Sequence, residues 1–140
     1  MKTIKFGLFA IVALLFIACG GGQKDKIVGE WKLKEFTRDG KTIELTDCDR
    51  QTVWDFTTTD AEPLSDGTKV QQLKGESPKE CKFYNFDSKW MVKDGEIFIS
   101  SCRIGGMGGM SLAGLMEIVE LTDDKLVVSS MDNQITLDRK

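Results

Sequence analysis

The side chains with the widest choice of chemistry in this sequence are its four cysteines, Cys19, Cys48, Cys81 and Cys102. A cysteine sulfur can carry a lipid, pair with a second thiol, or act as a nucleophile. The sequence contains no histidine. This excludes serine and cysteine nucleophiles that need a histidine base, and zinc sites with histidine ligands.

Paired carboxylates are the remaining candidates for acid–base catalysis. Two pairs occur, Asp47 with Asp49 and Asp123 with Asp124, and two carboxyl groups can act as general acid and general base. Both pairs stand in segments typical of turns, where acidic side chains are common because water and local hydrogen bonds solvate them. We therefore predict that the protein is not an enzyme and has no catalytic residue, metal site or cofactor.

Cys19 follows a segment typical of an export signal. Lys2 and Lys5 precede the uncharged apolar run 6–18, which has thirteen residues, whereas a helix that spans a bilayer needs about 20. A short basic start, an apolar run of this length and small residues at its end indicate a secretory signal peptide. We predict that residues 1–18 are this signal peptide and lie outside the folded domain.

The four residues that end at Cys19 (Phe16-Ile17-Ala18-Cys19) resemble the lipobox of bacterial lipoproteins, although Ile17 is larger than usual there. The resemblance implies that Cys19 becomes the first residue of the mature chain and that its sulfur carries a diacylglyceryl group. Two or three acyl chains hold a protein on a membrane, whereas one binds only marginally. Residues 19–26 are then a lipidated flexible tether, because glycine-rich segments form flexible coils. Ordinary secretion with cleavage elsewhere is the alternative.

The expected location follows from this anchor. No aspartate follows Cys19 directly, and the sorting rule of enteric bacteria then points to the outer membrane of the cell envelope. The segment 20–26 (GGGQKDK) matches no surface-export signal, so the periplasmic and the cell-surface face both stay open. Without residues 1–18, 17 basic residues face 22 acidic ones, a net charge of −5. We expect no nucleic-acid partner, because such binding needs clustered Lys and Arg.

The elements that carry these residues are predicted to be β-strands. From residue 27 onward, apolar and polar residues alternate in short runs, and Asp39-Gly40 and Asp94-Gly95 are two-residue hairpin signals. The run 69–73 is weak, so we predict about eight to nine strands. The alternating runs are 27–36, 42–45, 52–58, 69–73, 81–86, 89–92, 96–100, 115–121, 125–130 and 134–139.

Sequential hairpins favour an up-and-down antiparallel β-barrel, because closure removes exposed strand edges. A two-sheet sandwich is the alternative, since alternation alone does not separate the two. Ordered segments of 27–140 resemble the lipocalin-like domains of lipoproteins from Bacteroidetes-type bacteria. The segments are the G-x-W start 27–41, Asp47-Cys48 before 52–57, Cys81, the hairpin 90–99 and 118–129. The resemblance implies one lipocalin-like barrel domain over 27–140, with an apolar interior and no particular ligand.

An oxidising compartment favours disulfides, but with Cys19 lipidated only three cysteines remain. Cys48 and Cys81 lie beside turns and match the two positions at which these lipocalin-like domains carry cysteines. The resemblance thus implies a Cys48–Cys81 disulfide, which would close a loop of about 34 residues and add about 3–4 kcal/mol of stability. Cys102 is then expected to be a free thiol, inert and half-buried.

A barrel of this kind would hold a small hydrophobic ligand among aromatic side chains. The candidate ligand-binding residues are Trp54, Phe56, Tyr84, Phe86, Trp90 and Phe98. The alternative is that these side chains fill the core, because small barrels are often packed solid, and that the protein is a structural or protein-interaction lipoprotein. An apolar cavity of about several hundred Å³ would favour the first function, and a filled interior the second.

Gly29, Trp31 and Arg139 are predicted to close one end of the barrel. In lipocalins the tryptophan of the first-strand G-x-W closes one end, and an arginine near the end of the barrel sequence packs across its ring. Trp31 and Arg139 occupy the matching positions, and Arg139 alternates onto the apolar face of the last strand. The alternative is that Arg139, as the penultimate residue, frays into water.

The segment 103–114 departs from the family pattern because the connection there is usually shorter. It holds five glycines within ten residues, which predicts that no stable strand forms. One interpretation is a disordered surface loop. The other is a mobile lid, in which Met107, Met110 and Leu112 supply flexible apolar contacts.

Overall fold

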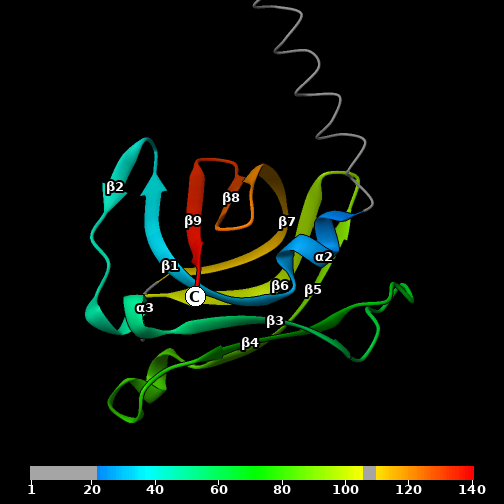
Figure 1. Ribbon diagram of the computed structural model, residues 1–140, viewed down its shortest axis with the longest axis horizontal. Coiled ribbons are helices and arrows are strands. Elements are labelled where there is room, and N and C mark those ends of the chain that lie inside the picture. The colour runs from blue at the N-terminus through cyan, green and yellow to red at the C-terminus, as the bar shows by residue number, and fades with distance from the viewer. Residues whose placement is uncertain (1–21, 106–109) are drawn as a thin grey trace, which may run out of the picture.

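The computed structural model describes residues 22–105 and 110–140 of the chain (Figure 1). The predictions for the signal peptide 1–18, for the Cys19 anchor and for Met107 lie outside these residues. The tether predicted for 19–26 is helical in its described part, since α2 (Gln23–Ile27) begins at Gln23. Among the described residues, no helix has the length and apolar character needed to cross a membrane.

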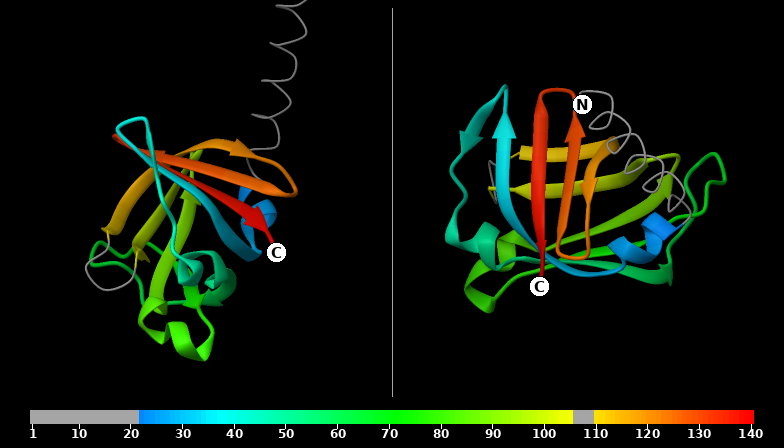
Figure 2. Two further views of the ribbon diagram at one scale, coloured as in Figure 1. Left: turned by 90° about the vertical axis from the view of Figure 1, so that its left-hand side faces the viewer. Right: turned by 45° about the horizontal axis from the view of Figure 1, so that its top comes forward.

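Nine strands of the described chain form a single antiparallel sheet. They are β1 (Gly29–Arg38), β2 (Lys41–Ile43), β3 (Val53–Asp60), β4 (Gln71–Glu76), β5 (Phe86–Lys93), β6 (Glu96–Ile104), β7 (Met110–Leu121), β8 (Lys125–Ser130) and β9 (Asn133–Arg139). Strands β3 to β9 pair in chain order, and β1 pairs with both β3 and β9 (Figure 2). Eight strands therefore close into an up-and-down barrel, with β2 as an extra strand. The predicted lipocalin-like all-β barrel is confirmed.

Strand β1 connects the two ends of the sheet because both of its edges are paired. Its first residues pair with β3 and its last three with β2, while β9 runs along the opposite edge. A bulge between Leu33 and Glu35 shifts the alternation by one residue. As a result Trp31, Leu33 and Phe36 are all buried. The predicted Asp-Gly hairpins also form, since both residues of each turn have positive φ, as a type I′ turn requires.

The strand predicted at 81–86 is wrong, because most of this segment is the 3₁₀ helix η2 (Lys79–Tyr84). Pro78 precedes the helix, and its carbonyl accepts a hydrogen bond from the Cys81 N–H. Apolar residues recur over too short a run here to distinguish a period of two from a period of three. A second short helix, α3 (Asp47–Gln51), separates β2 from β3 and was also missed.

The prediction that the glycine-rich segment forms no strand is also wrong for its described part. Strand β6 continues to Ile104, and β7 begins at Met110. Gly114 lies within β7 with a φ of +104° and pairs with Ile99, where the ladder between β6 and β7 shifts register. Between this pair and the next one, Cys102 with Leu112, β6 advances three residues and β7 only two. The extra residue of the bulge therefore lies in β6, and β7 continues as a strand through Gly114.

Candidate functional site

The barrel interior is the first candidate site, and its described side chains form one hydrophobic cluster. Trp31, Trp54 and Trp90 are each at most 1% exposed. Phe56 meets Trp90 edge to face, with 5.2 Å between ring centroids. The Trp90 indole N–H donates to the Thr57 carbonyl oxygen at 3.0 Å. The polar atom of this ring is thus satisfied by backbone, and its apolar surface faces inward.

The six candidate ligand-binding residues do not share one surface. Trp54, Phe56 and Trp90 lie together in the interior, and Phe86 packs at its margin, edge to face with Trp54. Tyr84 belongs to η2, and Thr46 Oγ1 donates to its hydroxyl oxygen. Phe98 alternates onto the outer face of the barrel, opposite Met91 and Leu115. Three of the six are therefore core residues, and a fourth packs against them.

Small residues occur on the inner face of the sheet where large side chains pack opposite them. A Cβ at Gly75 would lie 2.2 Å from the Phe86 ring, so this glycine gives the ring its space. Gly114, at an inward-facing position of β7 between Leu112 and Met116, differs, because a Cβ there would meet no atom within 4 Å. There is open space beside this residue.

One end of the barrel is closed by Arg139, as the sequence predicts. Its guanidinium carbon lies 4.0 Å from the centroid of the Trp31 ring. The same group donates to the carbonyl oxygens of Val28 (2.9 Å), Asp123 (3.0 Å) and Lys26. Gly29 has a φ of +128°, and a Cβ there would lie 2.7 Å from Arg139 Nη1. The glycine of the G-x-W motif is therefore needed both for its backbone conformation and to admit the arginine.

Helix α2 completes this closed end of the barrel. Ile27, its last residue, is fully buried in the core. The Ile27 carbonyl accepts a 2.7 Å hydrogen bond from the Trp31 indole N–H. The helix that follows the predicted tether is thus fixed to the first strand of the barrel.

The opposite end is covered by α3 and η2, which the Cys48–Cys81 disulfide joins. This confirms the predicted pairing. Asp49 of α3 is only 3% exposed, and its carboxylate accepts bonds from the Thr46 N–H and from the Gly105 N–H at 2.8 Å. Asp49 therefore ties α3 to the end of β6. Sequence reasoning assigned it to a solvated turn, although the Thr46-x-x-Asp49 spacing is a signal for a helix capping box.

Cys102 is free, as predicted, but it is buried rather than half-buried, with 1% of its surface exposed. Burial in the apolar core raises the pKa of its thiol to about 12. Partial burial also raises the pKa of Asp55 on β3, and the nearby carboxylates of Glu30 and Glu76 raise it further. In the described chain no cluster of three or more His, Cys, Asp or Glu side chains is placed to hold a metal ion.

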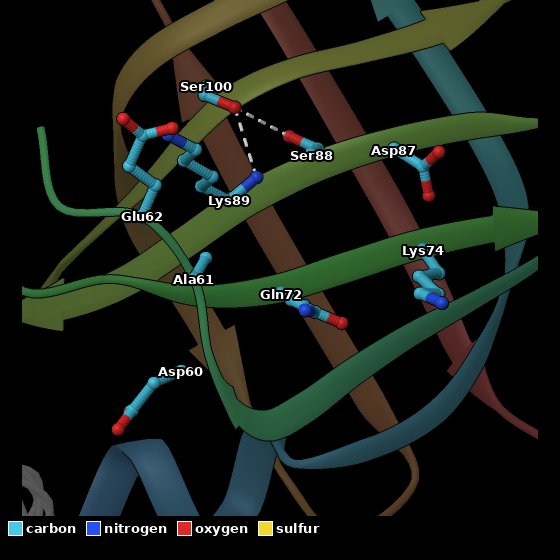
Figure 3. Close-up of a pocket in the computed structure, with 9 residues that line it drawn as sticks. All are labelled: Asp60, Ala61, Glu62, Gln72, Lys74, Asp87, Ser88, Lys89 and Ser100. Carbon is cyan, nitrogen blue, oxygen red and sulfur yellow. Dashed lines mark hydrogen bonds between the residues drawn. The ribbon is translucent and has the colours of Figure 1, made fainter.

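A polar groove of about 420 Å³ lies on the barrel wall (Figure 3). Its lining residues are Asp60, Ala61, Glu62, Gln72, Lys74, Asp87, Ser88, Lys89 and Ser100. The Ser88 and Ser100 hydroxyls lie 3.0 Å apart where the ladder between β5 and β6 ends, and the Lys89 N–H donates to Ser100 Oγ. This lining of charges, amide and hydroxyls suits a polar molecule rather than a hydrophobic one.

The chain is similar to a known protein family in sequence and to a solved structure in fold. The sequence model of a family described as a lipocalin-like domain matches residues 27–128. The crystal structure of an uncharacterized protein from Bacteroides eggerthii DSM 20697 is similar, with 16% sequence identity and a TM-score of 0.47, over 81% of this chain and 98% of that chain. None of the curated proteins matches the chain.

Proposed function

Because the chain belongs to the lipocalin-like domain family, we propose that it is a membrane-anchored lipoprotein whose barrel binds a small hydrophobic molecule. The family fold is generally a non-enzymatic binding fold, and the proposal gives this chain the same kind of role. The membrane would be the outer membrane of a bacterial cell envelope, at its periplasmic or its cell-surface face. Cys19 would carry the lipid anchor.

The apolar interior of the closed barrel carries the binding proposal. Barrels of eight strands are just wide enough to be filled by side chains or to hold one small ligand. Trp54, Phe56 and Trp90 present apolar ring surface to this interior. A ligand there would be held by burial of apolar surface, with few polar contacts to fix its orientation.

The tight packing of the interior favours a second function, that of a structural or protein-interaction lipoprotein that holds no ligand. Every tryptophan of the core is at most 1% exposed, and the groove of about 420 Å³ on the wall is polar. If no ligand enters the barrel, the protein would act through its outer surface. The two functions predict different behaviour with an apolar probe.

Titration of the protein with N-phenyl-1-naphthylamine, a neutral apolar fluorophore, tests where a hydrophobic molecule binds. Binding inside the barrel predicts saturation at one probe per protein, quenching of tryptophan emission, and a changed affinity in Trp54→Phe. The matched control is Leu115→Lys, because Leu115 is 57% exposed on the outer face and this variant should bind the probe like wild type. The binding proposal is contradicted if Leu115→Lys abolishes binding while Trp54→Phe leaves it unchanged, or if no saturable binding occurs.

A further inference from the structure

A row of apolar side chains crosses the outer face of three neighbouring strands. Met91 on β5 pairs with Phe98 on β6, and Phe98 pairs with Leu115 on β7. Leu115 is 57% exposed, and Val119, further along β7, is 51% exposed. We call Met91, Phe98, Leu115 and Val119 the outer apolar row. Apolar side chains grouped on one outer face of a small domain are typical of a contact surface rather than of scattered exposure.

The row lies beside the point where the N-terminal segment joins the barrel. Helix α2 packs against β5 and β7, two of the three strands that carry the row. Lys24 of α2 lines one cavity together with Met91 and Val92. The surface next to Gly22, the first described residue, therefore includes the start of the outer apolar row.

The distance from Gly22 to the predicted anchor limits where the membrane can be. Cys19 precedes Gly22 by three residues, and three residues span at most about 11 Å in any conformation. A lipid on Cys19 would thus hold the membrane surface close to α2 and to the strand ends beside it. The face that carries the row adjoins α2 at the cavity that Lys24 shares with Met91 and Val92.

Charges around the row are nearly balanced. Exposed Lys24, Asp25 and Lys26 lie on α2, and exposed Lys93 lies at the end of β5. Exposed Glu96 and Glu117 occupy neighbouring register positions on β6 and β7, and Glu117 lies between Leu115 and Val119 along β7. Contact with a membrane would therefore depend mainly on apolar surface and little on anionic lipid headgroups.

We infer that the outer apolar row lies against the membrane that holds Cys19, with Phe98, Leu115 and Val119 at the boundary between headgroups and acyl chains. This inference rests on the proposed lipid anchor. It gives the barrel a fixed orientation, with the wall formed by β5, β6 and β7 facing the bilayer and the β2 side facing away.

The test places a tryptophan in the row and measures its quenching by lipid. The lipidated Leu115→Trp protein is reconstituted into phosphatidylcholine vesicles whose acyl chains are either unmodified or brominated near the headgroup. The three native tryptophans are at most 1% exposed, so their emission should change little. The matched control is Thr42→Trp, an exposed position on β2. Val119→Trp is a second reporter if Leu115→Trp misfolds.

We expect brominated lipid to reduce the added emission of Leu115→Trp by about half or more, and that of Thr42→Trp by little. Flotation of the same samples reports attachment separately. If both variants float with the vesicles and are quenched equally, the inferred orientation is wrong although the anchor stands. Cross-linking of Leu115→Trp into pairs without quenching would show a second copy on the row, and would also overturn it. If wild type fails to float, the anchor proposal itself is wrong, and the inference falls with it.

Discussion

At the scale of single residues, Arg139 connects the last strand to the first strand and to α2. Replacing it with alanine removes the cation–π contact with Trp31 and the bonds to three carbonyl oxygens. We expect Arg139→Ala to lower the free energy of unfolding by about 2 kcal/mol or more and to shift the emission of Trp31. Denaturant unfolding followed by fluorescence measures both quantities.

Lys140→Ala is the control for this prediction. The Lys140 ammonium pairs with the exposed Glu30 carboxylate, at 3.9 Å, and such surface pairs contribute little. Equal unfolding midpoints for Arg139→Ala and Lys140→Ala would show that Arg139 does not stabilise the closed end.

The buried Cys102 thiol gives a second prediction at this scale. Burial raises its pKa from 9.0 to about 12, so the thiol stays protonated in the folded protein across pH 7–9, where an exposed thiol would become reactive thiolate. We expect no reaction of native protein with 5,5′-dithiobis(2-nitrobenzoic acid) at either pH, and one reactive thiol after denaturation without reductant. A native reaction rate that rises tenfold per pH unit would contradict the burial of this side chain.

The raised pKa of the Cys102 thiol also makes the free energy of unfolding depend on pH. The pKa is raised in the folded state, so the stabilisation from the neutral thiol is complete below pH 9 and is lost as pH rises from 9 to about 12. Cys102→Ala should therefore show a smaller loss of stability over this range than wild type.

At the scale of elements, the stability of helix α3 depends on Asp49. Its carboxylate completes the capping box with Thr46 and accepts the Gly105 N–H. Asp49→Ala leaves the partly buried N–H groups of Thr46 and Gly105 without this acceptor, and we expect it to lower the free energy of unfolding by about 2 kcal/mol. Thermal unfolding of Asp47→Ala is the matched control, since Asp47 lies on the same helix with its side chain 92% exposed. A midpoint for Asp49→Ala as high as that of Asp47→Ala would refute this role.

The strands were predictable from the sequence wherever one face is apolar and the turn is short. The hairpin of β5 and β6 is an example, because Asp94-Gly95 fixes its register. The segments at the end of the barrel that α3 and η2 cover were not predictable in this way. The segment 79–84 is short, and its conformation is determined by contacts with residues distant in the sequence. These contacts include the Cys48–Cys81 disulfide and the hydrogen bond from the Arg103 guanidinium to the Phe83 carbonyl oxygen.

The candidate site was predictable only in part, for the same reason. Alternation placed Trp54, Phe56 and Trp90 correctly on inward faces. It gave no means to place Tyr84, which lies in a helix, and it did not separate the outward Phe98 from the inward aromatic residues. Trp31 and Arg139 were predictable because a family resemblance named their contact, which no local pattern encodes.

At the scale of the whole molecule, the anchor and the barrel are expected to be separable. Cys19→Ser removes the proposed site of lipidation but no residue of the described barrel, so it should release the protein from membranes without unfolding it. Phase separation in Triton X-114 measures attachment, and near-ultraviolet circular dichroism of the buried tryptophans measures folding. Cys102→Ala should stay in the detergent phase like wild type. Finding Cys19→Ser there at wild-type levels would contradict the anchor.

Native mass spectrometry of the mature protein, purified from its host membranes, decides whether the barrel holds a ligand. A hydrophobic molecule held in the barrel predicts a native mass that exceeds the denatured mass by one small molecule, because denaturation releases the ligand but keeps the covalent lipid on Cys19. We predict this mass difference in most of the protein, together with a denatured mass that includes the anchor. Identical native and denatured masses would contradict the claim that the barrel binds a ligand.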